Sequence, residues 1–318
     1  MIRHQIRLAA AAAACLVLAA CSQPADMGPP QVDVPTPLPA GIDFSPEIAT
    51  DPVDESCQPL ASYNPGAVTV DAAKAQLDSQ DQINIGVSQS TNLMGYIDPE
   101  TNTPAGFDID IATAIAHSIL GPDATIRWVP MTSKQREDAV NTDRVDMVVR
   151  TMTMNCDRWA NVEFSAEYYH AGQRLLVPAA SGIEGLADLA ADHLVCTGEG
   201  STSVRTIAEQ SAAQAVTVPD FNDCLVLLQQ GTVDAITSDD TILAGMAAQD
   251  PTLRVVGEAF SQEPYGIAFQ KGNTDLARYV NKALAEIIAN GTWQTAYDKW
   301  LKGPLGVAGA PPSPQYRD

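Results

Sequence analysis

The chain has 318 residues and 45% apolar content, which is enough for two packed lobes of ordinary size. Its formal net charge of −21 argues against a nucleic-acid partner, and it means that any anionic ligand must meet a locally basic site. An apolar N-terminus and a proline-rich stretch precede the part of the sequence that has regular apolar periodicity.

The first 20 residues have the pattern of a lipoprotein signal peptide. Arg3 and Arg7 precede an apolar run over residues 8–20, and cleavage is expected before Cys21. A lipidated Cys21 would hold the protein on the outer face of the cytoplasmic membrane. Removal of this segment takes away two arginines and no acid, so the formal charge moves to about −23. No other stretch of the sequence is apolar enough to predict a membrane span.

Residues 21–60 are rich in proline and poor in periodic apolar residues, which predicts a lipidated, extended tether. The proline-rich residues 304–318 are predicted to form a tail. Between them strands and helices alternate, which predicts an α/β fold with a parallel, doubly wound sheet. The predicted strands are 83–87, 125–129, 147–149, 173–177, 194–197, 233–237 and 266–269. The predicted helices are 71–79, 106–120, 133–140, 183–189, 204–210, 222–230, one that starts at 241, 276–289 and 293–301.

Cysteine usage indicates disulfides. Once Cys15 has left with the signal peptide and Cys21 is modified, four cysteines remain, which are Cys57, Cys156, Cys196 and Cys224. An even number in an exported protein predicts two disulfides, and three pairings are possible. We favour Cys196–Cys224, because both lie in what the pattern suggests is one lobe, and this leaves Cys57–Cys156. Zinc is the alternative, but no C-x-x-C motif or histidine pair supports it, so no metal and no cofactor is expected.

Polar residues follow the apolar run Met147–Val149, which looks like a buried strand. Thr151, Thr153 and Arg158 come directly after it, at the carboxyl end of a strand, where open α/β sheets bind small ligands. A guanidinium can take a carboxylate through two parallel N–H···O bonds. The alternative is that Arg158 is an ordinary residue of a solvated loop.

Two further strand ends carry candidate binding groups. A glycine-rich turn over residues 198–203 lies between a strand and a helix, so it presents backbone N–H groups to an anion. A dinucleotide fingerprint is not supported there, because Ser203 stands where its third glycine belongs. Asp239 follows another strand and can bind an ammonium group, or it can cap the helix that starts at Thr241.

In this order and spacing, five motifs resemble those of the solute-binding family 3, the periplasmic amino-acid-binding proteins of ABC transporters. The motifs are Gly106-Phe107-Asp108-Ile109-Asp110, Val145-Asp146 with Thr151-x-Thr153-x4-Arg158, Gly200-Ser201-Thr202, Val233-Asp234-Ala235 with Asp239, and Asn290-Gly291-Thr292-Trp293 with Tyr297 and Trp300. The similarity covers about residues 71–303. Within the family, the chain most resembles the actinobacterial glutamate- and glutamine-binding lipoproteins.

The resemblance implies a type II periplasmic-binding-protein fold, in which two doubly wound α/β lobes are joined by a two-segment hinge. The first lobe is expected to contain residues 61–172 and 267–303, and the second residues 173–266. The two crossings are expected near 171–174 and 262–266. The ligand is then trapped when the lobes close.

The resemblance also implies roles for single residues. Arg158 is expected to bind the ligand α-carboxylate, helped by Thr153 and by N–H groups at Thr202. Asp239 and the Thr151 carbonyl are expected to hold the α-ammonium. Ser201 and Ser88 also belong to the expected set of ligand-binding residues.

Selectivity for the ligand side chain is expected to depend on two more arginines. Arg136 stands where acidic-amino-acid binders of this family carry an arginine, and Arg150 replaces a small residue of the glutamine binders. Both favour glutamate or aspartate over glutamine or asparagine, unless Arg136 faces solvent. Thr91 and Ser133 occupy the places of the aromatic clamp of the glutamine binders, and Tyr96 is a partial replacement for it.

The expected function is binding without catalysis. A monomer would capture the amino acid and present it to an ABC permease or to a membrane amino-acid sensor, with no nucleic acid involved. The alternative is an enzyme on the same fold, such as a dehydratase, with Glu199 as its candidate general acid.

Overall fold

The computed structural model describes residues 36–48 and 57–318. Residues Leu38–Asp318 form one compact unit. The predicted signal peptide and Cys21 lie outside the described residues. No helix in the described part of the chain is long and apolar enough to cross a membrane.

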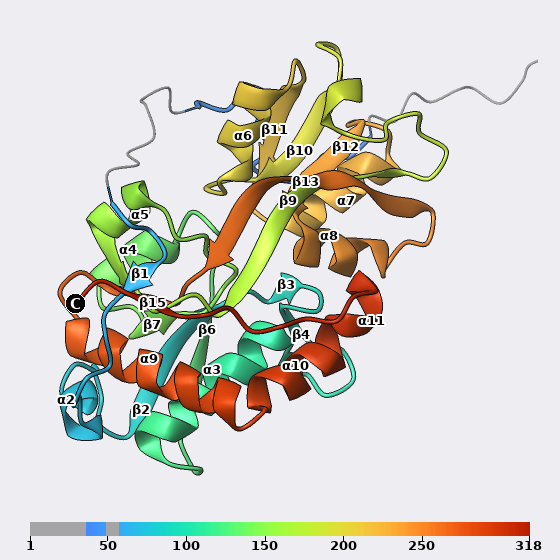
Figure 1. The fold of residues 1–318 in the computed structure, drawn as a ribbon. Coiled ribbons are helices and arrows are strands. Elements are labelled where there is room, and N and C mark those ends of the chain that lie inside the picture. The colour runs from blue at the N-terminus through green and yellow to red at the C-terminus, as the bar shows by residue number, and fades with distance from the viewer. Residues whose placement is uncertain (1–35, 49–56) are drawn as a thin grey trace, which may run out of the picture. The chain divides into compact units, whose positions relative to one another are not determined.

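Five strands form the sheet of the part that we call lobe 1 (Figure 1). Their order is β6 (Thr125–Pro130), β2 (Gln82–Val87), β7 (Met147–Val148), β14 (Ala268–Gln270) and β8 (Val162–Phe164). β6, β2 and β7 run parallel, whereas β14 is antiparallel to both of its neighbours. Five of the six residues of β2 are buried, as expected for a strand that is covered on both faces.

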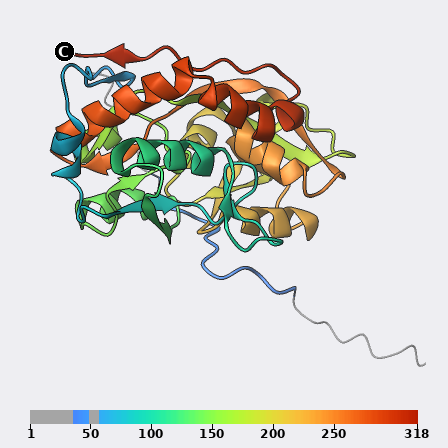
Figure 2. The ribbon, with the colours of Figure 1, turned by 90° about the horizontal axis from the view of Figure 1, so that it is seen from below.

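Three helices pack against one another on lobe 1, namely α3 (Phe107–Leu120), α9 (Thr274–Ala289) and α10 (Thr292–Trp300) (Figure 2). In α9 the buried residues recur at helical spacing, for example at Leu276, Val280 and Leu284. Trp293 and Tyr297 of α10 stack at 5.4 Å between ring centroids and are 1% exposed, so they serve packing. The smaller elements are α2 (Val70–Lys74), α4 (Arg136–Asn141), α5 (Cys156–Asn161), α11 (Lys302–Leu305), β3 (Ser90–Thr91), β4 (Gly95–Ile97) and β5 (Pro104–Ala105).

Lobe 2 is built on a second five-stranded sheet (Figure 1). Its strand order is β11 (Gln214–Val218), β10 (Leu194–Gly198), β12 (Ala235–Asp239), β9 (Tyr169–Pro178) and β13 (Leu253–Tyr265). The helices are α6 (Ser203–Gln210), α7 (Phe221–Gln229) and α8 (Asp240–Ala247). The helix predicted over 183–189 is wrong in kind, because only the 3₁₀ turn η1 (Leu186–Asp188) forms there.

Two long strands connect the lobes. β9 follows β8 of lobe 1, and β13 leads back to β14 of lobe 1. They pair with each other in antiparallel register, from Tyr169 opposite Tyr265 to Pro178 opposite Leu253. β9 is also antiparallel to β12, so the sheet is mixed where the sequence pattern predicted only parallel strands. The alternation of strands and helices along the sequence does not reveal antiparallel strands of this kind. A strand that enters the sheet from the other lobe is not connected to its neighbour by a crossover helix.

Several long-range contacts join distant parts of the described chain. Both predicted disulfides, Cys57–Cys156 and Cys196–Cys224, are confirmed, so no free thiolate remains among them for a zinc site. Asp43, inside the predicted tether, forms an antiparallel bridge with Thr217 of β11. β1 (Ala61–Ser62) pairs with β15 (Gln315–Tyr316), so the predicted tail is bonded to lobe 1 near its end. The predicted domain boundaries stay predictions, and the one at 172/173 falls inside β9.

Candidate ligand-binding site

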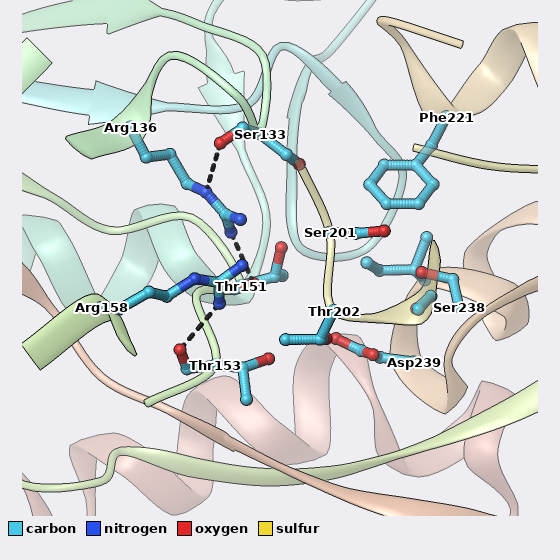
Figure 3. A pocket seen from close by; sticks show the side chains of 12 residues that line it. Ser133, Arg136, Thr151, Thr153, Arg158, Ser201, Thr202, Phe221, Ser238 and Asp239 are labelled. Atoms are coloured by element: carbon cyan, nitrogen blue, oxygen red, sulfur yellow. Dashed lines mark hydrogen bonds between the residues drawn. The ribbon is translucent and has the colours of Figure 1, made fainter. Parts of the chain in front are cut away.

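A narrow cleft lies between the two lobes and is lined from both sides (Figure 3). Lobe 1 contributes Ser133, Arg136, Thr151, Thr153 and Arg158, and lobe 2 contributes Ser201, Thr202, Ser203, Phe221, Ser238, Asp239 and Ile242. The free space among these side chains is about 10 Å³, room for about one water molecule. An amino acid therefore needs the lobes to separate before it can enter.

Arg158 lies at the cleft because it belongs to the first turn of α5, which begins beside the cleft. The Asn155 side chain caps the helix by accepting from the Arg158 backbone N–H at 2.8 Å. Arg158 as a whole is 7% exposed, and its guanidinium donates to the Thr153 carbonyl at 2.7 Å and to the Gly200 carbonyl of lobe 2 at 3.1 Å. Its nearest acid is Glu137, with 3.8 Å between Nε and Oε1. Burial lowers the pKa of Arg158, and the solvated-loop alternative is wrong.

Arg136 also turns inward, so the alternative in which it faces solvent is wrong. It is 3% exposed, and each of its hydrogen-bond acceptors is a backbone carbonyl. Nε donates to Ser133 at 2.8 Å, Nη1 donates to Arg150 at 3.2 Å and to Thr151 at 3.0 Å, and Nη2 donates to Gly200 at 3.2 Å. Burial, then repulsion from the Arg158 and Arg150 guanidiniums, lowers the pKa of Arg136 well below its ordinary value.

Arg150 lies one layer behind the cleft and does not line it. The residue is 3% exposed, and its side chain donates from Nε to the Met131 carbonyl at 2.8 Å and from Nη1 to the Ser133 hydroxyl oxygen at 2.5 Å. Burial lowers the pKa of Arg150 to about 10. Because the Ser133 hydroxyl oxygen accepts a hydrogen bond from Arg150, the proton of the Ser133 hydroxyl is left to donate into the cleft.

Asp239 ends β12 at the opposite wall. It occupies the N-cap position of α8, but its side chain makes no capping hydrogen bond, so the capping alternative is wrong. Tyr265 donates its hydroxyl to Oδ2 at 2.6 Å. Asp239 as a whole is 5% exposed, and burial, reinforced by the nearby Glu263, raises the pKa of its carboxyl group well above the ordinary value.

Thr151 is held in a strained backbone conformation, with φ at 37°. Its N–H donates to Asp108 Oδ2 at 3.1 Å, and the other oxygen of Asp108 accepts from the Tyr168 hydroxyl at 2.8 Å. Burial raises the pKa of Asp108 to about 7, although both hydrogen bonds oppose the shift. The Thr151 carbonyl, expected to hold an ammonium, accepts from Arg136 in this structure.

Ser88 does not line the cleft. Its hydroxyl is paired with that of Thr91 at 2.8 Å. Tyr96, expected as a partial aromatic clamp, instead packs edge-on against Trp300 at 6.1 Å between centroids. The aromatic ring that lines the cleft is Phe221, which comes from lobe 2.

The lobes also touch outside the cleft. Lys134 of lobe 1 forms an ion pair with Glu199 of lobe 2, whose side chain is 40% exposed at the rim. Glu199 is therefore not a buried acid of the kind a dehydratase would need. On another side, the Asn92 side chain donates to the Gly245 carbonyl at 3.1 Å. A Cβ atom on Gly245 would lie 2.4 Å from the Asn92 carbonyl oxygen, so the observed approach needs glycine.

The sequence interpretation missed Glu263 and Tyr265 of β13, which lie below the cleft. Ser261, Glu263 and Tyr265 alternate along a strand and so share one face of it. A polar residue at every second position of a crossing segment was the signal that could have found them.

Residues 83–303 match the family model for bacterial extracellular solute-binding proteins, family 3, and the chain belongs to this family. A relative is the ABC transporter glutamine-binding protein GlnH of Bacillus subtilis (strain 168), 36% identical over 229 residues, which are 72% of this chain and 84% of GlnH. Another is the glutamate-binding protein GluB of Corynebacterium glutamicum, 33% identical, with 67% of this chain and 76% of GluB covered.

A solved structure titled as an ancestral arginine-binding protein bound to glutamine has a TM-score of 0.66 and 32% identity, and it covers 70% of this chain and 99% of its own. The type II periplasmic-binding-protein fold is thereby confirmed. Both relatives are named as amino-acid-binding proteins, GlnH as that of an ABC transporter, and this chain is a solute-binding protein of the same family.

Proposed function

We propose that this protein is an extracytoplasmic lipoprotein that binds L-glutamate or L-aspartate, with glutamine and asparagine as weaker ligands, by closure of its two lobes. Relatives named for glutamine and for glutamate binding support an amino-acid ligand. A relative named L-glutamate/L-aspartate-binding protein, 28% identical, supports the acidic class.

The observation that carries the acidic ligand is the cluster of buried guanidiniums of Arg136, Arg150 and Arg158. Among the described residues, the only acid within ion-pair distance of any of them is Glu137, at 3.8 Å from Arg158. Their hydrogen-bond acceptors are backbone carbonyls and one hydroxyl. Three buried cations with a single acid within ion-pair distance among the described residues form a positive site in a protein of net charge −21.

A ligand carboxylate can replace these neutral acceptors and form stronger, charge-assisted hydrogen bonds. We place the α-carboxylate at Arg158 and the α-ammonium at Asp239, on the two walls of the cleft. A side-chain carboxylate then reaches Arg136 and the free proton of Ser133. An amide in that place would bring an NH₂ group toward donors, which leaves its protons without acceptors.

The membrane partner belongs to the same proposal. The relative GlnH is named as the glutamine-binding protein of an ABC transporter, which supports a permease as the receiver of the ligand. A membrane sensor of amino-acid availability is the other receiver that a lipid-anchored monomer could serve. The anchor at Cys21 would keep the binding lobes close to either one.

Calorimetric titration of the purified protein with L-glutamate, L-aspartate, L-glutamine, L-asparagine and L-arginine tests the ligand class. We expect one of the two acids to bind tightest, with a dissociation constant near 1 μM or about −8 kcal/mol. D-Glutamate is the control for stereochemistry and should bind at least about tenfold more weakly. Tightest binding of arginine, or no binding by any of the five, would contradict the proposal.

A further inference from the structure

A carboxylate that the binding scheme above does not use lies behind two threonines that line the cleft. Glu263 lies on β13, the second crossing strand, and is 2% exposed. It forms no ion pair with any of the described residues, although it lies near enough to Arg158 and Asp239 to influence both. A buried carboxylate without a cationic partner needs hydrogen-bond donors.

Three hydroxyl groups supply those donors. Thr153 of lobe 1 donates to Glu263 Oε2 at 2.6 Å, and Thr202 of lobe 2 donates to the same oxygen at 2.8 Å. Ser261, on the same strand, donates to Oε1 at 2.5 Å. Figure 3 shows Thr153 and Thr202 approaching each other from the two walls, with Asp239 beside them. One carboxylate oxygen thus joins the two lobes.

The direction of these hydrogen bonds has a chemical consequence for the ligand. A hydroxyl has a single proton, and an ionised carboxylate can only accept. Once Thr153 and Thr202 have donated to Glu263, both hydroxyls have only lone pairs left for the cleft that they line. Lone pairs accept from an ammonium and repel a carboxylate.

We propose that Glu263 is a positioning residue that sets the orientation of the bound amino acid. Glu263 accepts the hydrogen bonds that the hydroxyls of Thr153 and Thr202 donate. This end of the cleft therefore accepts hydrogen bonds from the ligand ammonium and repels the ligand carboxylate. The inference rests on the proposed function and deepens it. It also changes the expected role of Thr153, whose hydroxyl then serves the ammonium and not the α-carboxylate.

Two replacements separate this role from a merely structural one. Glu263→Met has about the same size but accepts nothing, so both hydroxyl protons become free to turn into the cleft. Glu263→Gln is the matched control, because its amide oxygen can still accept from both threonines while its NH₂ group faces Ser261. Ser261→Ala is a second control, since it removes the third hydroxyl and leaves the two threonine bonds in place.

The readout is a ratio of affinities for two ligands that differ by one group. Titration gives the dissociation constant of L-glutamate, and competition against it gives that of glutarate, which lacks the ammonium; if another amino acid binds tighter, its deaminated analogue is used. We expect Glu263→Met to reduce the preference for the amino acid over its analogue by about tenfold or more. Glu263→Gln and Ser261→Ala should each keep this preference within about threefold.

If Glu263→Met weakens both ligands by the same factor, or weakens neither, the ratio of affinities is unchanged. Either result would assign Glu263 a structural role or none, and would overturn the inference. If Glu263→Met does not fold, Thr202→Val takes its place, because it removes one of the two acceptors; an unchanged ratio there overturns the inference as well. Wild-type protein that binds no amino acid defeats the proposed function and this inference together. Normal wild-type binding with an unaltered ratio in the variants defeats only the inference.

Discussion

The two walls of the cleft differ in what they can offer a ligand. Lobe 1 presents the guanidiniums of Arg136 and Arg158, with Arg150 behind them, all held by several hydrogen bonds. Lobe 2 presents the carboxylate of Asp239, the Gly200 carbonyl and hydroxyls. The anion site is therefore complete within one lobe, whereas the ammonium needs both. We expect the carboxylates to bind first and the ammonium to favour closure.

Removal of Arg158 should have the largest effect, because it disrupts the anion site of lobe 1. Arg158→Ala loses the charge-assisted bonds to the α-carboxylate and should weaken L-glutamate binding by about 100-fold or more. Calorimetric titration provides the measurement, and circular dichroism shows whether the variant is folded.

Arg158→Lys serves as the control for charge. It keeps the positive charge but cannot form two parallel bonds, so about a tenfold loss is expected. Binding by the alanine variant within tenfold of the wild type would remove Arg158 from the α-carboxylate role.

Arg136 should separate acids from amides. Arg136→Ala is expected to weaken L-glutamate binding by about 30-fold and L-glutamine binding by less than about fivefold, since only the acid has a second carboxylate there. Titrations of the same preparation with both ligands measure the two losses. Equal losses would show that Arg136 supports the cleft without reading the side chain.

Gly245 tests closure without touching the predicted ligand contacts. Alanine at this position in α8 should favour the helix itself by about 1 kcal/mol, yet its Cβ would meet the Asn92 carbonyl of lobe 1 when the lobes close. We therefore expect Gly245→Ala to keep or raise the melting temperature while weakening ligand binding by about tenfold.

A matched control is Gly231→Ser, at a turn where a Cβ would meet nothing. Its positive φ of 68° should lower stability, but binding should stay as in the wild type. Unchanged ligand affinity in Gly245→Ala would mean that the contact between Asn92 and Gly245 is not needed for the bound state.

The smallest expected effect is a dependence on pH. Burial raises the pKa of Asp239 well above its ordinary value, and a bound ammonium should lower it again. Binding then releases a proton at any pH between the ordinary and the raised value, so affinity should increase with pH in that window, by at most about tenfold per unit. Titration from about pH 5.5 upward measures the slope, starting above the ordinary range of a ligand carboxylate.

Stability of the ligand-free protein should change in the opposite sense. A raised pKa means that the folded state favours protonated Asp239, so this contribution to the free energy of unfolding is lost as pH rises above about 4. Asp239→Asn should remove both trends at once. A steep pH dependence of binding that persists in Asp239→Asn would point to another group, and Asp108, with a pKa of about 7, is the first to examine.

Sequence patterns predicted the features that depend on residues close together in the chain, above all individual strands and helices. Apolar runs with helical or strand spacing located β2, α3 and α9, and cysteine usage led to both disulfide pairs. Arg158 and Asp239 could be proposed because each comes after a predicted strand, and both line the cleft.

What could not be predicted depends on the contact between lobes. No strand was predicted for the segment that contains Glu263, and although its alternation with Ser261 and Tyr265 could have marked the residue, its role depends on the approach of Thr153 and Thr202 from opposite lobes. Similarly, Arg150 looks like a cleft residue in sequence, but its bond to Ser133 places it one layer behind. Such layers follow from tertiary packing, which residue spacing along the chain does not contain.

A crystal structure of the protein with L-glutamate would test the central claim most directly. We predict the α-carboxylate on the Arg158 guanidinium, the side-chain carboxylate on Arg136, and the ammonium on Asp239 with the hydroxyls of Thr153 and Thr202. A ligand whose carboxylates lie away from both guanidiniums, or whose ammonium lies away from Asp239, would contradict it.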